Sequence, residues 1–107
     1  MNKYQVIYSP TAKEDLFTIY RYIAFELLEP DIAEKLVNRI RNRIKKLDMF
    51  PKKHQEVQWE TWLSMGMRKL PVDNFVVYYL VNDDRNLVTV VRILYGGRNI
   101  ENIIQDF

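Results

Sequence analysis

Apolar residues recur every three or four positions through the first half of the chain. One stripe holds Ala12, Leu16, Ile19, Tyr20, Ile23 and Leu27, and a second holds Ile32, Leu36, Ile40, Ile44 and Leu47. This spacing places the apolar side chains on one face of a helix. The sequence therefore predicts one amphipathic helix from about Pro10 to Leu28 and another from Pro30 to Phe50-Pro51. Because the connection between them is short, the two helices are expected to form an antiparallel hairpin.

The N-terminal end of the first helix carries its own signals. Pro10 is favoured in a first helical turn, and Thr11 with Glu14 fits a capping box. The sequence therefore predicts Thr11 as the residue that caps this helix.

The periodicity changes to two in the second half of the chain and in the first residues. Alternating runs occur in "YQVIYS", in "MRKL", in 75–81 and in 87–94, separated by the turn-forming strings "PVDN" and "NDDRN". Alternation of this kind predicts strands. Both faces of 75–81 and 87–94 are apolar, which indicates central strands covered on both sides. The string "NIENIIQDF" at the end of the chain reads as a short helix or an extension.

The elements follow the order β-α-α-β-β-β. Helices grouped before strands indicate an α+β fold: an antiparallel sheet with the helical hairpin packed on one face. The 107 residues fit one domain, 1–107, and no linker or internal repeat interrupts them.

Composition excludes several classes of function. The chain has no cysteine and a single histidine, His54, so thiolate and histidine-cluster metal sites are excluded, and we expect no metal and no cofactor. The N-terminus lacks the apolar core of a signal peptide, and no apolar run approaches the roughly 20 residues of a membrane span. We therefore expect a cytoplasmic protein without a membrane partner.

Positive charge is concentrated in one segment. Residues 30–53 contain eight Lys and Arg against three acids, a net of +5, whereas 1–29 carry −1 and 54–107 carry −2. Such a segment can steer a polyanion towards the protein. The alternative is the ordinary solvated face of an amphipathic helix.

Five strings in this order resemble the RelE/ParE superfamily of bacterial toxins. They are "YQVIYSPTAKEDLFTIYRYI", "EPDIAEKLVNRI", "LDMFPKK", "MRKLPVDNFVVYYLV" and "VTVVRILYGGRN", and together they span nearly the whole chain. The resemblance implies the toxin of a type II toxin-antitoxin system, growth-inhibiting and often involved in plasmid stabilisation. It also implies a cognate antitoxin that masks the toxin, with operator DNA contacted only through that antitoxin.

The superfamily has two branches with different targets. RelE-like members resemble ribosome-dependent messenger RNA endoribonucleases that need no metal, and ParE-like members resemble poisons of DNA gyrase that are not enzymes. The long helical hairpin and the "VRIL" ending favour the ParE-like branch. A third alternative is a non-toxic relative that only binds a partner.

The resemblance to RelE-like nucleases carries over at some positions and fails at others. Lys69 and Arg98 match a catalytic lysine and arginine, and Tyr95 is a candidate proton donor or base-stacking platform. Val76, Met67 and Ile104, in contrast, stand where RelE has an arginine, a lysine and a tyrosine. These mismatches weaken the nuclease interpretation.

The remaining candidates concern binding and architecture. Arg68, Arg98, Trp59 and Trp62 are candidate contacts for the target or the antitoxin, because arginine and tryptophan often anchor interfaces. Arg68 and Lys69 are adjacent in a predicted strand and must point to opposite faces. Arg92 lies in an apolar strand, and we expect either a structural ion pair with a carboxylate such as Asp15 or a surface role. Gly96 and Gly97 then allow the chain to leave the sheet and present Arg98.

Overall fold

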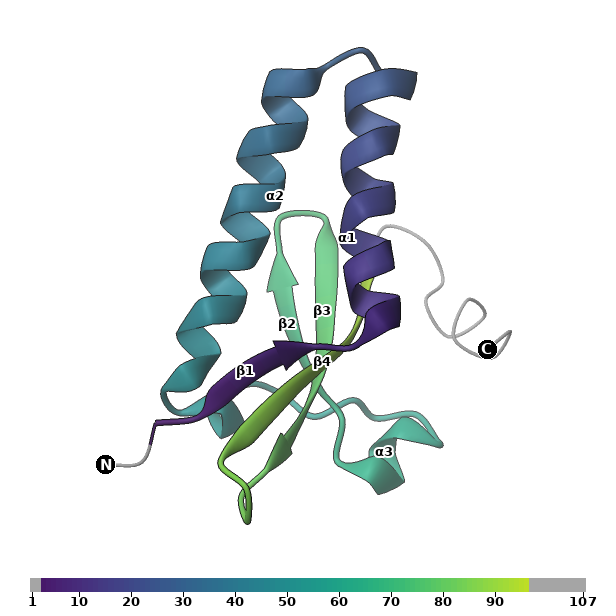
Figure 1. Cartoon of the computed structure of the whole chain (residues 1–107). Helices are drawn as coiled ribbons and strands as arrows, with labels where there is room; N and C mark the ends of the chain where they lie inside the picture. The colour runs from purple at the N-terminus through teal and green to yellow at the C-terminus, as the bar shows by residue number, and fades with distance from the viewer. Residues whose placement is uncertain (1–2, 97–107) are drawn as a thin grey trace.

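The computed structural model describes residues 3–96 of the chain. Its elements are β1 (Gln5–Tyr8), α1 (Pro10–Arg21), a π-helical turn (Tyr22–Glu26), α2 (Pro30–Lys45), two 3-10 turns (Lys46–Asp48 and Pro51–Lys53), α3 (Trp62–Met65), β2 (Arg68–Val72), β3 (Phe75–Asn82) and β4 (Leu87–Tyr95). Figure 1 shows the helical hairpin standing against the sheet and reaching beyond it. The predicted order β-α-α-β-β-β is confirmed, with the one-turn helix α3 added before β2. The predicted C-terminal helix or extension lies outside the described residues.

The four strands form one mixed sheet in the order β1-β4-β3-β2. β2, β3 and β4 pair antiparallel, but β1 runs parallel to β4, with Gln5 beside Leu87 and Tyr8 beside Val90. The prediction of a purely antiparallel sheet was therefore wrong for β1. Alternation indicates which faces of a strand are buried, but it carries no information on strand direction. That direction was decided by the helical crossover that separates β1 from the other strands.

Ser9 caps α1. Its hydroxyl accepts a hydrogen bond from the Ala12 N–H at 3.0 Å and donates one to the Val91 carbonyl at 2.9 Å. Pro10 occupies the first helical position, which leaves Thr11 inside the first turn. The predicted capping box with Thr11 was therefore wrong, because proline prefers the first position and this assigns the cap to the residue before it.

The hairpin turns through irregular backbone. After Arg21 the first helix continues as the π-helical turn, in which the Leu27 N–H bonds to the Tyr22 carbonyl at 3.0 Å. Leu28 then adopts a left-handed conformation with φ of 58°. Pro30 begins α2 as its first residue, as the sequence predicted. The first helix therefore ends close to the predicted Leu28, although its last turn is not α-helical.

One face of the sheet packs against the hairpin. The buried residues here come from both long helices, the 3-10 turn after α2 and the strands β2, β3 and β4: Ala12, Leu36, Ile40, Ile44, Leu47, Leu70, Val72, Val77, Tyr79, Val88, Val90 and Ile93. This face is called the helix face. Arg39 on α2 also holds the β2–β3 turn, since its guanidinium lies 2.6 Å from the Asp73 carboxylate. The second predicted stripe therefore supplies much of the main core, and Ala12, Leu16, Ile19 and Ile23 of the first stripe pack into it.

The opposite face of the sheet is covered by the segment that joins α2 to β2. Val57, Met67, Tyr78 and Leu94 are buried there, with Trp59 and Trp62 packed against them. This face is called the loop face, and α3 lies beside it in Figure 1. The expectation that the central strands are covered on both sides is confirmed.

Candidate functional site

An aromatic cluster with one lysine occupies the loop face. The ring centroids of Trp62 and Tyr78 are 4.7 Å apart, and those of Trp59 and Tyr78 are 6.4 Å apart. The Lys69 ammonium lies 5.7 Å from the centre of a Trp59 ring, within the range of a cation–π interaction. The structure therefore brings three predicted site residues together on one surface: Trp59, Trp62 and Lys69.

Two features of this cluster bear on its chemistry. Burial raises the pKa of Tyr78 to about 12, so its phenol keeps its proton near neutral pH. The indole N–H of Trp59 is buried and has no hydrogen-bond partner among the described residues. Indole is a donor only, so this cluster offers aromatic surface, a cation and a phenol that keeps its proton.

Arg68 and Lys69 point to opposite faces of the sheet, as the sequence predicted. The Arg68 guanidinium donates hydrogen bonds to the Lys52 carbonyl at 2.9 Å and the His54 carbonyl at 2.7 Å. It also lies 3.9 Å from the Glu56 carboxylate. These contacts fix the connection that precedes α3, so the Arg68 side chain is engaged within the fold.

His54 is partly buried beside β3. Its ring packs edge-on against Tyr79, with the centroids 6.3 Å apart. Partial burial and the positive charges of Lys53, Arg43 and Arg68 lower the pKa of His54 below its ordinary value. The lowered pKa favours the neutral form of the His54 ring near pH 7.

Tyr95 lies on the other side of the sheet from Lys69. Its ring packs against Phe75 with centroids 5.5 Å apart, and Phe75 belongs to the helix face. The side chain is 48% exposed. Lys69 and Tyr95 are thus separated by the sheet, while Arg98 and Ile104 lie outside the described residues. Met67 is fully buried and Val76 packs on the loop face, so neither position supplies a polar group.

Arg92 and Asp15 form the expected ion pair between β4 and α1. Asp15 accepts hydrogen bonds from Arg92 Nε at 2.7 Å, from a terminal Arg92 nitrogen at 3.0 Å and from the Ile93 N–H at 3.0 Å. Both side chains are 13% exposed. The pair sits next to a β-bulge at Val91, where β4 has one residue more than β3. Asp15 therefore binds the side chain and the backbone of β4 just beyond the bulge.

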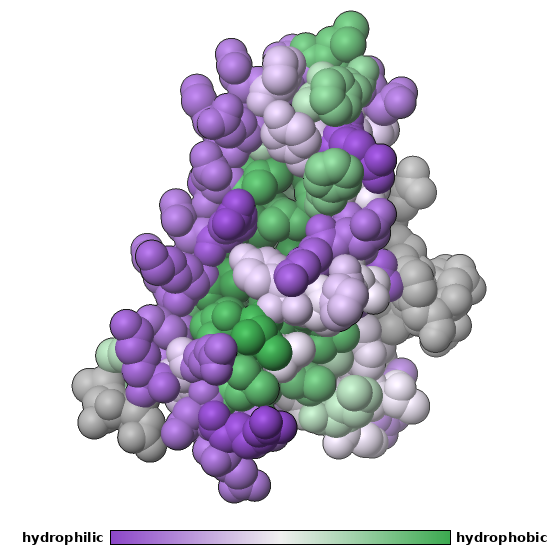
Figure 2. Space-filling model, in the orientation of Figure 1, coloured by the Kyte–Doolittle hydropathy of each residue, from purple (hydrophilic) through white to green (hydrophobic). Residues whose placement is uncertain are grey.

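The turn of the helical hairpin carries an exposed apolar surface that was not predicted from the sequence. Its residues are 52 to 76% exposed: Tyr22, Phe25, Leu27, Leu28 and Ile32. Figure 2 shows green apolar surface at the top of the molecule, where the hairpin turns. Ile32 and Leu27 had been assigned to the buried stripes, but the hairpin extends past the sheet there. The apolar stripes in the sequence are longer than the sheet they cover. This excess length was the feature of the sequence from which an exposed apolar surface could have been predicted.

Two further classes of site can be considered for the described part of the chain. Between residues 3 and 96, no group of three or more acidic or histidine side chains is placed to hold a metal ion. None of the helices in this range is long and apolar enough to cross a membrane.

The family model for the ParE toxin of the type II toxin-antitoxin system parDE matches residues 6–100. The chain belongs to the ParE toxin family. It is thus the toxin component of a type II toxin-antitoxin system, within the RelE/ParE superfamily that the sequence indicated. Comparison with curated protein sequences finds no match.

Solved structures with the same fold are distant in sequence. A structure of the chromosomal ParDE system of Pseudomonas aeruginosa is 22% identical with a TM-score of 0.71, covering 87% of this chain and 96% of the other. The toxin-antitoxin complex RelBE2 of Mycobacterium tuberculosis is 19% identical with a TM-score of 0.62, covering 89% and 93%. The isolated Escherichia coli RelE toxin is 13% identical with a TM-score of 0.55, covering 97% and 99%. Both branches of the superfamily therefore share this fold.

Proposed function

We propose that this ParE-family toxin inhibits bacterial growth by poisoning DNA gyrase through protein contacts, and that a cognate antitoxin neutralises it. In this proposal the toxin catalyses no reaction of its own and acts in the cytoplasm. The surfaces that bind gyrase or the antitoxin include the loop-face aromatic cluster and Arg98.

The placement of Lys69 and Tyr95 on opposite faces of the sheet is the observation that favours gyrase poisoning over RNA cleavage. Cleavage of RNA without a metal requires a base, an acid and a cation around one phosphate. Lys69 lies on the loop face and Tyr95 packs with Phe75 on the helix face. Tyr78, the tyrosine closest to Lys69 across the β2–β3 pair, keeps its proton because burial raises its pKa. The described residues thus favour a binding surface over a nuclease site.

Purified components test the proposal. With gyrase, supercoiled plasmid and ATP, the toxin is expected to accumulate gyrase-linked double-strand breaks, while a bacterial translation extract keeps its messages intact. Arg98→Ala is expected to abolish the breaks, and Lys13→Ala, an exposed change on α1, serves as the matched control. Intact plasmid together with cleaved ribosomal messages would overturn the gyrase proposal. Failure of both assays would favour a non-toxic partner-binding relative.

A ribosome-dependent endoribonuclease is the second candidate, and one observation favours it. The Lys69 ammonium lies beside the Trp59 ring, and Trp59 and Trp62 both pack against Tyr78. Aromatic rings with a nearby cation are the usual means of holding an unstacked RNA base next to its phosphate. If this is the function, Trp62→Ala and Lys69→Ala both reduce message cleavage on ribosomes, whereas a gyrase poison leaves messages intact in every variant.

The proposal of an antitoxin partner is supported by the exposed apolar surface of the hairpin turn. Contiguous exposed apolar residues such as Phe25 and Leu28 commonly mark protein interfaces. The neighbours from Pseudomonas aeruginosa and Mycobacterium tuberculosis are toxin-antitoxin systems. Expression from the native operon is expected to yield a stable complex with the product of the adjacent reading frame.

A further inference from the structure

Positively charged residues are frequent where α2 ends and the chain turns towards the loop face. Residues 43–53 contain five Lys and Arg against a single acid. Arg43, Lys46 and Lys53 are exposed, and none of them forms an ion pair within the described residues 3–96. The positive charge of this part of the sequence is therefore not neutralised by carboxylates of the described fold.

The fold brings Arg43 and Lys53 together beside His54. Burial, and then the charges of Lys53, Arg43 and Arg68, lower the pKa of His54. Because a charge must be near a group to shift its pKa, cations from α2, from the following turn and from β2 all lie close to this ring. Lys46 follows Arg43 by three residues, so it is a neighbour of Arg43 on the helix surface.

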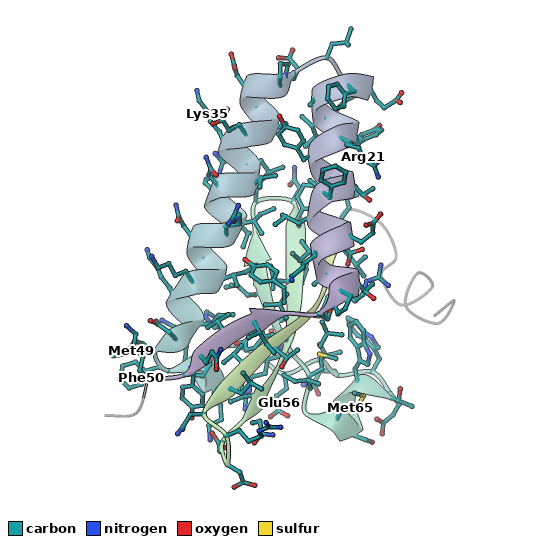
Figure 3. All side chains as sticks on the ribbon, in the orientation of Figure 1. Arg21, Lys35, Met49, Phe50, Glu56 and Met65 are labelled. Atoms are coloured by element: carbon teal, nitrogen blue, oxygen red, sulfur yellow. The ribbon has the colours of Figure 1, made fainter. Side chains whose placement is uncertain are left out.

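An exposed aromatic side chain belongs to the same turn. Phe50 is 61% exposed, and Figure 3 shows it with Met49 at the end of α2. The Met49 N–H donates a hydrogen bond to the Lys46 carbonyl at 3.3 Å. The Lys53 N–H donates one to the Phe50 carbonyl at 3.2 Å. The surface formed by Arg43, Lys46, Phe50 and Lys53 is called the basic surface.

The backbone at Phe50 is strained and firmly held. Phe50 has φ of 52° and ψ of 50°, a left-handed conformation that bulky residues rarely adopt. The Tyr79 hydroxyl donates to the Pro51 carbonyl at 2.6 Å. The Arg68 guanidinium donates to the Lys52 carbonyl at 2.9 Å. Strain that the surrounding structure maintains in this way is concentrated at functional positions in proteins, so the exposed ring is a candidate contact.

We propose that the basic surface binds duplex DNA, with its three cations on the phosphate backbone and Phe50 as an apolar wedge in the minor groove. Lysine and arginine bind phosphate through charge-assisted hydrogen bonds. Apolar side chains of minor-groove proteins insert against base steps in the manner proposed for Phe50. That this duplex is the segment held by gyrase rests on the proposed function, whereas the contact with DNA does not.

Duplex DNA fits the basic surface better than other polyanions do. Proteins hold single-stranded nucleic acids on several aromatic rings in succession, whereas the basic surface offers the one ring of Phe50. Anionic membranes are bound by helices with a broad apolar face. Here the apolar contribution comes from Phe50 and from Met49, which is 37% exposed. A backbone of regularly spaced phosphates with a groove for one wedge matches this combination.

The contact with DNA can be tested on the full chain by fluorescence anisotropy. A labelled duplex of about 20 base pairs and random sequence is titrated with the toxin between about 25 and 200 mM salt, because each phosphate contact contributes about −0.9 to the slope of log K against log salt. The triple variant Arg43→Gln, Lys46→Gln, Lys53→Gln is expected to reduce the magnitude of this slope by about 2 to 3 and to weaken binding at least about tenfold.

A second triple variant is the matched control. Lys13→Gln, Lys35→Gln and Arg41→Gln remove the same charge from other exposed positions of α1 and α2 and are expected to change the slope by less than about 1. Equal slopes and affinities in the two triple variants would show that only net charge matters and would overturn the proposal. Tighter binding of a single-stranded RNA of equal length, of anionic vesicles or of a polyglutamate peptide would also overturn it.

Phe50→Asn separates the wedge from the charges. Asparagine tolerates the left-handed conformation better than phenylalanine does, so this variant is expected to melt at or above the wild-type temperature. Duplex binding is expected to weaken about three- to tenfold with an unchanged salt slope, because an apolar contact is lost and no charge is removed. Wild-type affinity in Phe50→Asn would overturn the role of the ring.

Cleavage assays with gyrase and supercoiled plasmid distinguish this inference from the proposed function. At about 0.15 M salt, the Arg43, Lys46 and Lys53 triple variant is expected to lose most of the double-strand breaks while still co-purifying with gyrase in the absence of DNA. Breaks at the wild-type level in this variant would overturn the DNA contact and leave gyrase poisoning intact. Duplex binding by the wild-type toxin without any breaks would instead overturn gyrase poisoning and leave the DNA contact standing.

Discussion

The two edge strands of the sheet, β1 and β2, differ in how far their outward backbone N–H and C=O groups are hydrogen-bonded. At β2, the Lys69 N–H donates to the Gln55 carbonyl at 3.0 Å, and the Met67 carbonyl accepts from the Val57 N–H at 2.8 Å. Pro71 occupies the next outward position and has no N–H to offer. At β1, in contrast, the backbone N–H and C=O groups of Val6 and Tyr8 point away from β4. Both residues line a groove between β1 and α2. The β2 edge is closed by a covering segment and a proline, a common protection against association. The β1 edge is covered only at Tyr4, whose N–H donates to the Asp48 carbonyl at 2.9 Å.

The open stretch is short because α1 closes the rest of β4. β1 ends at Tyr8, opposite Val90, while β4 continues to Tyr95. Beyond this point, Ser9 binds the Val91 carbonyl and Asp15 binds the Ile93 N–H. The exposed strand edge is therefore limited to Val6 and Tyr8 of β1, which lie beside α2.

The largest effect is expected from Arg92→Ala. This change leaves the largely buried Asp15 carboxylate without its charged partner, and breaking such a pair costs about 3–5 kcal/mol of unfolding free energy. Urea unfolding followed by circular dichroism measures it. Lys3→Ala, which breaks only the exposed pair with Asp48, is the control and is expected to cost less than about 1 kcal/mol. A stable Arg92→Ala protein would mean that α1 does not depend on this pair to close β4.

Arg68→Ala is expected to loosen the covered edge. It removes donors to the Lys52 and His54 carbonyls, and leaving such acceptors without a partner costs about 1–3 kcal/mol. The Lys69 amide, which bonds to Gln55, should then exchange with solvent faster while the amides of β4 stay protected. Lys69→Ala is the matched change on the opposite face and should leave that exchange slow. Uniform exchange in both variants would contradict a local role for Arg68.

A smaller effect is expected from pH at the same edge. Because the pKa of His54 is lowered in the folded protein, the unfolded chain binds a proton more readily. Stability is therefore expected to fall as pH drops through the ordinary histidine pKa of about 6.5 and to level off below the lowered folded value. Thermal melts between pH 7.5 and 5 measure this slope, and His54→Gln should flatten it. An unchanged slope in the variant would assign the pH dependence to other groups.

The smallest change in stability is expected from Pro71→Val. The substitution restores an N–H on the outer side of β2 and keeps the residue exposed, so the unfolding free energy should change by about 0.5 kcal/mol or less. Its effect should appear in association, because an edge protected by proline becomes able to pair. Light scattering at increasing concentration measures this, with wild type as the reference. If the variant scatters as wild type does at every concentration, the covering segment alone protects this edge.

Local sequence determined most of the elements. The apolar stripes from Ala12 to Leu27 and from Ile32 to Leu47 fixed two amphipathic helices, and Pro30 fixed the start of the second. Alternation fixed β3 and β4 and showed that both their faces are buried. The Arg92–Asp15 pair was predictable because a charged residue in an apolar strand requires a counter-charge nearby. These inferences succeeded because each depends on a few neighbouring residues or on a single burial rule.

The tertiary structure decided everything that depends on residues far apart in the chain. Strand alternation has no direction, so only the complete fold placed β1 parallel to β4 and left its outer edge open beside Asn38 and Arg41. Likewise, the sequence placed Lys69 and Tyr95 in one candidate site, whereas the sheet separates them. Leu27 and Ile32 at the hairpin turn were assigned to the buried stripes because periodicity indicates which helix face is apolar and not where the sheet beneath it ends. Burial and proximity depend on contacts made by residues from the whole chain, whereas a local sequence pattern reports only on neighbouring residues.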